Sequence, residues 1–159
     1  MSYKKRKTAE PAKAVFLPNT SEIRIAIVVS SWHPEITEVL FRGAKDTLTD
    51  AGISSRNILR KNVPGSFELP LGAKLLEDKA DAVICLGCII EGETKHADYI
   101  SHAVAEGIMR LNLDYAKPFI FGVLTTGNLA QAKARSGGKY GNKGAEAATA
   151  ALAMLAFKQ

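Results

Sequence analysis

Strand-like and helix-like segments alternate along this chain with few residues left over, and this alternation limits its fold more than any other feature. Strand-like runs, most of them apolar and β-branched, occupy residues 23–30, 58–63, 82–90 and 119–124. Apolar residues at helical spacing occupy residues 36–48, 69–77, 96–113, 128–135 and 143–157. Strands that alternate with helices pair in parallel, and helices cover both faces of their sheet. We therefore predict a three-layer α/β/α fold with a four-stranded parallel sheet.

The length and composition fit one globular domain. The chain has 159 residues, of which 47% are hydrophobic and 23% are charged, enough for one hydrophobic core. No apolar run approaches the roughly 20 residues that cross a bilayer, and no secretory signal follows the basic N-terminus. We expect a cytoplasmic protein without membrane contact. Residues 1–20 would be a basic tail and extended lead-in, and residues 21–159 a single domain.

The formal net charge of +5 is concentrated at the N-terminus. Residues 1–13 hold one acidic side chain and five basic ones, so only +1 remains for the rest of the chain; the basic residues are Lys4, Lys5, Arg6, Lys7 and Lys13. Short basic tails are usually solvated, and a basic groove on the fold is unsupported. We therefore expect no nucleic-acid partner. The alternative is an RNA-binding tail, whose binding would be salt-sensitive and lost when residues 1–13 are deleted.

Both cysteines lie in the apolar run of residues 82–90, where Cys85 and Cys88 formally match a C-x-x-C spacing. Side chains three residues apart on a strand point to opposite faces, whereas a redox or zinc pair needs converging sulfurs. The sequence therefore predicts two buried, unpaired thiols. Because no cluster of His, Cys and Asp has metal-ligand spacing, we expect no metal and no cofactor.

Ligands of open parallel sheets bind where loops leave the carboxyl ends of the strands, which here is after residues 30, 62, 90 and 124. The first loop holds Trp32, the only tryptophan, which would either cap the core or offer a flat shelf to a heterocycle. His33 beside it is most simply a helix-start residue. The second loop is stiffened by two prolines and a glycine, and it presents Phe67 and Glu68. Glu68 is either a solvated surface carboxylate or a ligand-binding group.

The third loop is the most informative, because it joins a buried strand to the strongest helix pattern. Unpaired N–H groups and a positive dipole end make a helix N-terminus a natural phosphate site. Thr94 can cap this helix and also bond an anion, and His96 in its first turn can exchange protons near neutrality. His96 can equally be an ordinary structural residue. After the fourth loop, Arg135 can hold a phosphate through two parallel hydrogen bonds.

Motifs of the common nucleotide-binding and hydrolytic enzymes are absent. The chain has no Walker phosphate loop, no G-x-G-x-x-G dinucleotide fingerprint and no G-x-S-x-G nucleophile elbow. The residues alone therefore predict an α/β enzyme with an anion site, aromatic surfaces and one candidate acid–base group.

Residues in these same loops resemble the lumazine synthases, from about residue 23 to residue 157. Five motifs in order and at matching spacing carry the resemblance: Ser31-Trp32, Val63-Pro64-Gly65-Ser66-Phe67-Glu68-Leu69-Pro70, Gly87-Cys88-Ile89-Ile90-Glu91-Gly92-Glu93-Thr94-Lys95-His96, Phe121-Gly122-Val123-Leu124-Thr125-Thr126, and Gln131-Ala132 with Arg135 and Gly141-Asn142-Lys143-Gly144. Two positions depart from the commoner pattern. His33 stands where Asn usually follows the aromatic residue, and Glu91 stands where a basic or apolar residue is frequent.

The resemblance implies a flavodoxin-like topology and a role for each residue that binds the first substrate, 5-amino-6-(D-ribitylamino)uracil. Trp32 would stack on the pyrimidine ring. The backbone of Ser66 and Phe67 and the carboxylate of Glu68 would hold the ribityl chain. The edge of the uracil would be read by the main chain of three residues, Cys88, Ile89 and Ile90.

The second substrate, 3,4-dihydroxy-2-butanone 4-phosphate, would be bound through its phosphate. The resemblance assigns this phosphate to Glu93, Thr94 and Arg135. Lys143 would assist them, and Phe121 of a neighbouring subunit would close the pocket.

The reaction that the resemblance implies is the condensation of these two substrates to 6,7-dimethyl-8-ribityllumazine, the penultimate step of riboflavin biosynthesis. His96 would be the catalytic proton shuttle, and phosphate and water would be released. The resemblance also implies a homo-oligomer, either a pentamer or an icosahedral shell of sixty subunits, with sites at subunit interfaces. The alternatives are a non-catalytic flavin or pterin binder and a purely shell-forming protein on the same scaffold.

Overall fold

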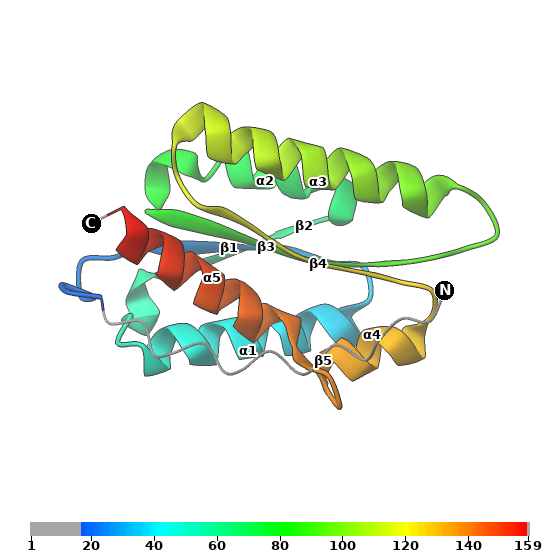
Figure 1. Cartoon of the computed structure of the whole chain (residues 1–159), viewed down its shortest axis with the longest axis horizontal. Coiled ribbons are helices and arrows are strands. Elements are labelled where there is room, and N and C mark those ends of the chain that lie inside the picture. The colour runs from blue at the N-terminus through cyan, green and yellow to red at the C-terminus, as the bar shows by residue number, and fades with distance from the viewer. Residues whose placement is uncertain (1–16, 159) are drawn as a thin grey trace.

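The computed structural model describes residues 17–158, which form three layers (Figure 1). Four parallel strands form the central sheet in the order β2-β1-β3-β4; they are β1 (Ile25–Ser30), β2 (Ile58–Val63), β3 (Ala82–Ile90) and β4 (Phe119–Thr126). One face is covered by α1 (Pro34–Asp50), α4 (Leu129–Arg135) and α5 (Lys143–Phe157), and the other by α2 (Leu69–Lys74) and α3 (His96–Tyr115). The predicted three-layer fold with a four-stranded parallel sheet is confirmed.

The two central strands, β1 and β3, are apolar because both of their faces are buried. Alternate residues of β1 enter different cores: Ile27 and Val29 pack with α1 and α5, whereas Ala26 and Val28 pack with α2 and α3. Leu17 also packs in the first core, so the predicted lead-in contributes one core residue. The predicted basic tail at residues 1–13 lies outside the described residues.

Three segments differ from the sequence prediction by more than one or two residues at the end of an element. Helix α2 ends at Lys74 rather than residue 77, because Leu76 leaves the helical conformation and turns into the core. The glycine-rich linker after α4 forms a small hairpin of β5 (Ser136–Gly138) and β6 (Gly141–Asn142). The apolar residues at helical spacing in 96–113 include Tyr99 and Ala103, which periodicity predicts to be buried but which are exposed, because the first half of α3 borders a cleft instead of packing on the sheet.

Helices α1 and α5 touch backbone to backbone at Gly144. A β-carbon on Gly144 would lie 1.9 Å from the carbonyl oxygen of Leu40, so only glycine fits this contact. Asn142 joins the same two helices. Its Oδ1 accepts hydrogen bonds from the N–H groups of Gly144 and Ala145, and its Nδ2 donates to the carbonyl of Val39 at 3.0 Å. The start of α5 is therefore fixed against α1 both by contact and by an N-terminal cap.

Cys85 and Cys88 belong to opposite cores, as predicted, and both are buried free thiols. Burial raises the pKa of the Cys85 thiol to about 12. Burial and the nearby carboxylate of Glu35 raise the pKa of the Cys88 thiol to about 11. Both side chains are therefore neutral at physiological pH. No helix within the described range is long and apolar enough to cross a membrane.

We expect both thiols to resist alkylation while the protein is folded. An ordinary cysteine has a pKa of about 8.5, so at pH 8 the raised values lower the thiolate fraction by roughly two to three orders of magnitude. Mass spectrometry after N-ethylmaleimide treatment at pH 8 should show no label on the native protein and two labels in concentrated urea. Fast labelling of the folded chain at pH 8 would contradict this expectation.

The same pKa shifts should lower the free energy of unfolding above about pH 9, because the unfolded thiols lose their protons first.

Candidate active site

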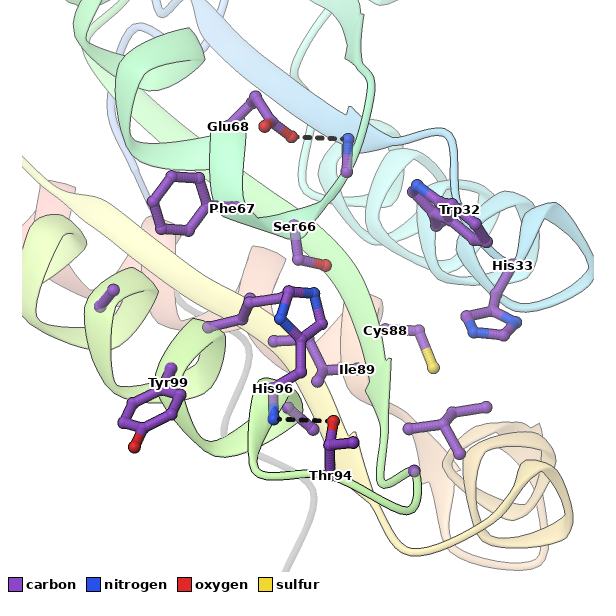
Figure 2. Close-up of a pocket in the computed structure, with 16 residues that line it drawn as sticks. Trp32, His33, Ser66, Phe67, Glu68, Cys88, Ile89, Thr94, His96 and Tyr99 are labelled. Carbon is purple, nitrogen blue, oxygen red and sulfur yellow. Dashed lines mark hydrogen bonds between the residues drawn. The ribbon is translucent and has the colours of Figure 1, made fainter.

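A cleft of about 800 Å³ opens at the carboxyl ends of the central strands. The loops after β1, β2 and β3 and the first two turns of α3 form its walls; the lining residues are Trp32, His33, Gly65, Ser66, Phe67, Glu68, Cys88, Ile89, Ile90, Gly92, Thr94, His96, Ala97, Tyr99, Ile100 and Ala103. This is where the parallel sheet leads one to expect a ligand. Figure 2 shows the indole of Trp32 and the imidazole of His96 on two sides of this cleft, with Ser66 and Cys88 between them.

Trp32 offers its ring to the cleft and does not cap the core, since 67% of its surface is exposed. Its backbone follows the buried Ser30, and His33 then adopts a left-handed conformation with φ of 56°. Asn, Asp and His are the non-glycine residues that best tolerate this region, which suits the residue found here. Gly65 lies beside the indole, because a β-carbon there would come within 3.1 Å of Trp32 Cδ1. The indole thus lies against a bare backbone and keeps its surface free.

The loop after β2 is held in shape by Glu68. One carboxylate oxygen, Oε2, accepts a hydrogen bond of 2.9 Å from the N–H of Gly65 (Figure 2). Glu68 is therefore not simply a solvated surface residue, and its side chain also lines the cleft. Phe67 next to it is largely exposed.

The hydroxyl of Ser66 is buried and has no hydrogen-bond partner in the described part of the chain. It fits there because Gly87 has no side chain, and a β-carbon on Gly87 would lie 2.6 Å from Ser66 Oγ. Burying an unpaired polar group costs about 1–3 kcal/mol, so such a group calls for a partner. Since Ser66 lines the cleft, a bound polar ligand can supply that partner.

His96 is the first residue of α3 and reaches the cleft from the side opposite Trp32. Its backbone N–H donates to Thr94 Oγ1 at 3.4 Å (Figure 2). The N-cap residue of α3 is Lys95 rather than Thr94, which differs from the predicted cap. An imidazole that faces a cleft can pass protons to and from a bound molecule. Glu93, by contrast, is exposed and does not line the cleft.

A second, smaller pocket of about 420 Å³ gathers three further predicted residues, Phe121, Arg135 and Lys143. It shares no lining residue with the cleft. Tyr140 lies under the guanidinium of Arg135, whose Cζ is 4.9 Å from the ring centroid. Glu146 pairs with Lys143, with Oε2 3.0 Å from Nζ.

The thirteen predicted site residues thus fall into two groups and one outlier. Nine line the cleft, three line the second pocket, and Glu93 lines neither. Sequence reasoning did not assign His33, Tyr99 and Tyr140 to a site. The left-handed turn after Trp32 and the exposed half of α3 bring the first two to the cleft, and neither feature can be read from hydrophobic periodicity.

Comparison with known proteins agrees with these motifs. The family model of 6,7-dimethyl-8-ribityllumazine synthase matches residues 22–159. A 6,7-dimethyl-8-ribityllumazine synthase of Cytophaga hutchinsonii is 57% identical to this chain. The match spans 88% of this chain and 89% of the relative. Enzymes of the same name from Parabacteroides distasonis and Christiangramia forsetii are 51% and 48% identical and cover 89% and 90% of this chain, and 89% and 87% of their own lengths. The chain therefore belongs to the 6,7-dimethyl-8-ribityllumazine synthase family.

Proposed function

We propose that this chain condenses 5-amino-6-(D-ribitylamino)uracil with 3,4-dihydroxy-2-butanone 4-phosphate to give 6,7-dimethyl-8-ribityllumazine in riboflavin biosynthesis. The observation that carries the proposal is the cleft in which an exposed indole, an imidazole and an unpaired buried hydroxyl meet at the edge of the sheet. A flat heterocycle with a polyhydroxyl chain suits such a surface, because it can stack and also form several hydrogen bonds.

Trp32 stacks on the pyrimidine ring of the first substrate. The ribityl chain lies along the loop after β2, where it meets the backbone of Ser66 and Phe67 and the carboxylate of Glu68. The main chain of Cys88, Ile89 and Ile90 reads the edge of the uracil. Glu68 already holds the Gly65 turn, so this loop is ordered before substrate arrives. Binding therefore costs less conformational entropy than ordering a mobile loop would.

The reaction proceeds through an imine. The 5-amino group of the uracil attacks the ketone carbon, and loss of water gives the imine. Removal of a proton from the adjacent carbon then lets the phosphate leave with the C–O bond electrons. The enol left behind takes up a proton at its terminal carbon and becomes a ketone. The ribitylamino nitrogen closes the ring on this new carbonyl, and a second water is lost. His96 takes up and returns the protons, and holding the two substrates together supplies part of the rate enhancement.

The phosphate of the second substrate is bound by Arg135 and Thr94, with help from Lys143. Arg135 and Lys143 lie with Phe121 in the second pocket, while Thr94 lies in the cleft. One subunit therefore supplies the cleft, and its neighbour supplies the second pocket. Glu93, which lines neither, has the weaker claim to the phosphate.

Pairing the two pockets requires a homo-oligomer. Apolar side chains that line both of them are exposed, as expected of surfaces that bind another subunit; they include Phe67 and Tyr99 in the cleft and Phe121 in the second pocket. Closed cyclic symmetry lets each subunit donate one pocket and receive the other. We propose a pentamer, either free or assembled into a shell of sixty subunits.

The direct test is to mix the purified protein with both substrates and to follow the fluorescence of the lumazine product. Formation of product that depends on both substrates supports the proposal. A flavin or pterin binder on the same scaffold would bind the product without forming it, and this outcome would overturn the enzymatic function.

Replacing His96 with Ala should lower kcat by roughly 100-fold, because a positioned acid–base group contributes at least this much. The same fluorescence assay measures the effect. His102→Ala is the matched control, since His102 is an exposed residue of the same helix outside the cleft. Unchanged turnover of the folded His96→Ala variant would remove His96 from the mechanism.

Replacing Arg135 with Ala should raise the KM for the sugar phosphate by roughly tenfold or more and leave the KM for the uracil nearly unchanged, because charge-assisted hydrogen bonds are worth about 1.5–3 kcal/mol. Lys133→Ala on the same helix is the control, because Lys133 is exposed and lines neither pocket.

A shared site also allows complementation between these variants. Oligomers reassembled from equal amounts of His96→Ala and Arg135→Ala subunits should regain activity at about a quarter of their sites, where two intact halves meet. Failure to regain any activity in verified mixed oligomers would mean that His96 and Arg135 act from the same subunit.

A further inference from the structure

The second pocket holds more positive than negative charge. Arg135 and Lys143 line it together with Tyr140, and Lys139 lies at the ring of Tyr140. The one carboxylate that lines the pocket, Glu146, is paired with Lys143. Within residues 17–158, neither Arg135 nor Lys139 forms an ion pair. Two cations without a counter-charge repel each other, so this arrangement favours a bound anion.

The ring of Tyr140 contacts both of these cations. Arg135 Cζ is 4.9 Å and Lys139 Nζ is 4.8 Å from the ring centroid, within the range of cation–π attraction. An exposed arginine has many rotamers, and fixing one of them costs free energy when a ligand binds. A ring that already holds the guanidinium reduces this cost before the anion arrives.

The position of this ring does not depend on its own packing. The N–H of Tyr140 donates to the carbonyl of Ala134 at 2.8 Å, which ties the hairpin to the end of α4. Gly138 lies so close to α4 that a β-carbon would be 2.7 Å from the carbonyl oxygen of Lys133. The Tyr140 side chain itself is 53% exposed. Its removal should therefore leave the hairpin in place, and packing in the core does not explain its presence.

We propose that Tyr140 is a positioning residue for the phosphate of the second substrate, and that it acts by holding the guanidinium of Arg135 through its aromatic face. This inference rests on the function proposed above, because it concerns the same half of the shared site. It adds a residue that none of the motifs carrying the resemblance includes and that has no direct contact with the reacting atoms.

The test measures the affinity for inorganic phosphate by calorimetry at fixed low ionic strength in the assembled protein. Tyr140→Ala should weaken phosphate binding about two- to fivefold, the range of an exposed cation–π contact. Tyr140→Phe keeps the aromatic face and should bind as the parent does, whereas Tyr140→Leu keeps apolar volume without that face and should bind as Tyr140→Ala does. In the enzymatic assay, Tyr140→Ala should raise the KM for the sugar phosphate by the same factor and leave kcat and the KM for the uracil unchanged.

A double-mutant cycle identifies the residue through which Tyr140 acts. In an Arg135→Ala background, Tyr140→Ala should cause no further loss of phosphate affinity. An equal loss in that background, rescue by Tyr140→Leu, or a changed oligomeric mass by light scattering would each overturn the proposal. Because the phosphate measurement needs no turnover, it is separate from the function itself. If the protein makes no lumazine but the variants show the expected phosphate affinities, only the proposed function is refuted. If the protein is active but Tyr140→Ala does not weaken phosphate binding, the role of Tyr140 is refuted.

Discussion

The burial of strands β1 and β3 on both faces is the constraint from which the rest of the structure follows. A strand between two layers of helices has no room for a charged side chain, and its backbone groups are used in the sheet. Polar chemistry is therefore moved to the loops at the ends of the strands. The change is abrupt: Ser30 is buried and accepts a hydrogen bond from the N–H of Trp32, whose indole is already in solvent. The cleft forms where the apolar strands stop.

The elements of this fold were predictable because each has a regular pattern. Strands β2 and β3 and helix α5 have the predicted bounds, since their patterns end at clear breaks. Periodicity could not show that Tyr99 is exposed, because it identifies the apolar side of a helix and not what covers that side. Nor could it decide between two readings of Trp32. That choice depends on the backbone of His33 and on the space beside Gly65, which arise only when distant segments meet.

The residues of the site were also predictable in part, but not how the fold groups them. The loops after the strand ends gave five residues of one cleft, because parallel strands bring their carboxyl ends together. The resemblance to the lumazine synthases added four more, which are Ser66, Cys88, Ile89 and Ile90. The grouping of Arg135 and Lys143 with Phe121 was not stated in the sequence prediction, which assigned only Phe121 to a neighbouring subunit. It results from the hairpin after α4, whose tight turn uses two glycines with positive φ, Gly137 and Gly141. The unpaired hydroxyl of Ser66 likewise depends on a glycine in a different strand.

The contact of Gly144 with Leu40 has an effect that extends beyond the core. Two helices that meet without an intervening side chain pack closely, and displacement of α5 along α1 would disturb this backbone contact. Lys143 and Glu146 flank Gly144 on α5, so the backbone of both pocket residues is held by the same contact. Because Gly144 has no side chain, α5 packs closely on α1, and this contact fixes the backbone from which the Lys143 side chain extends.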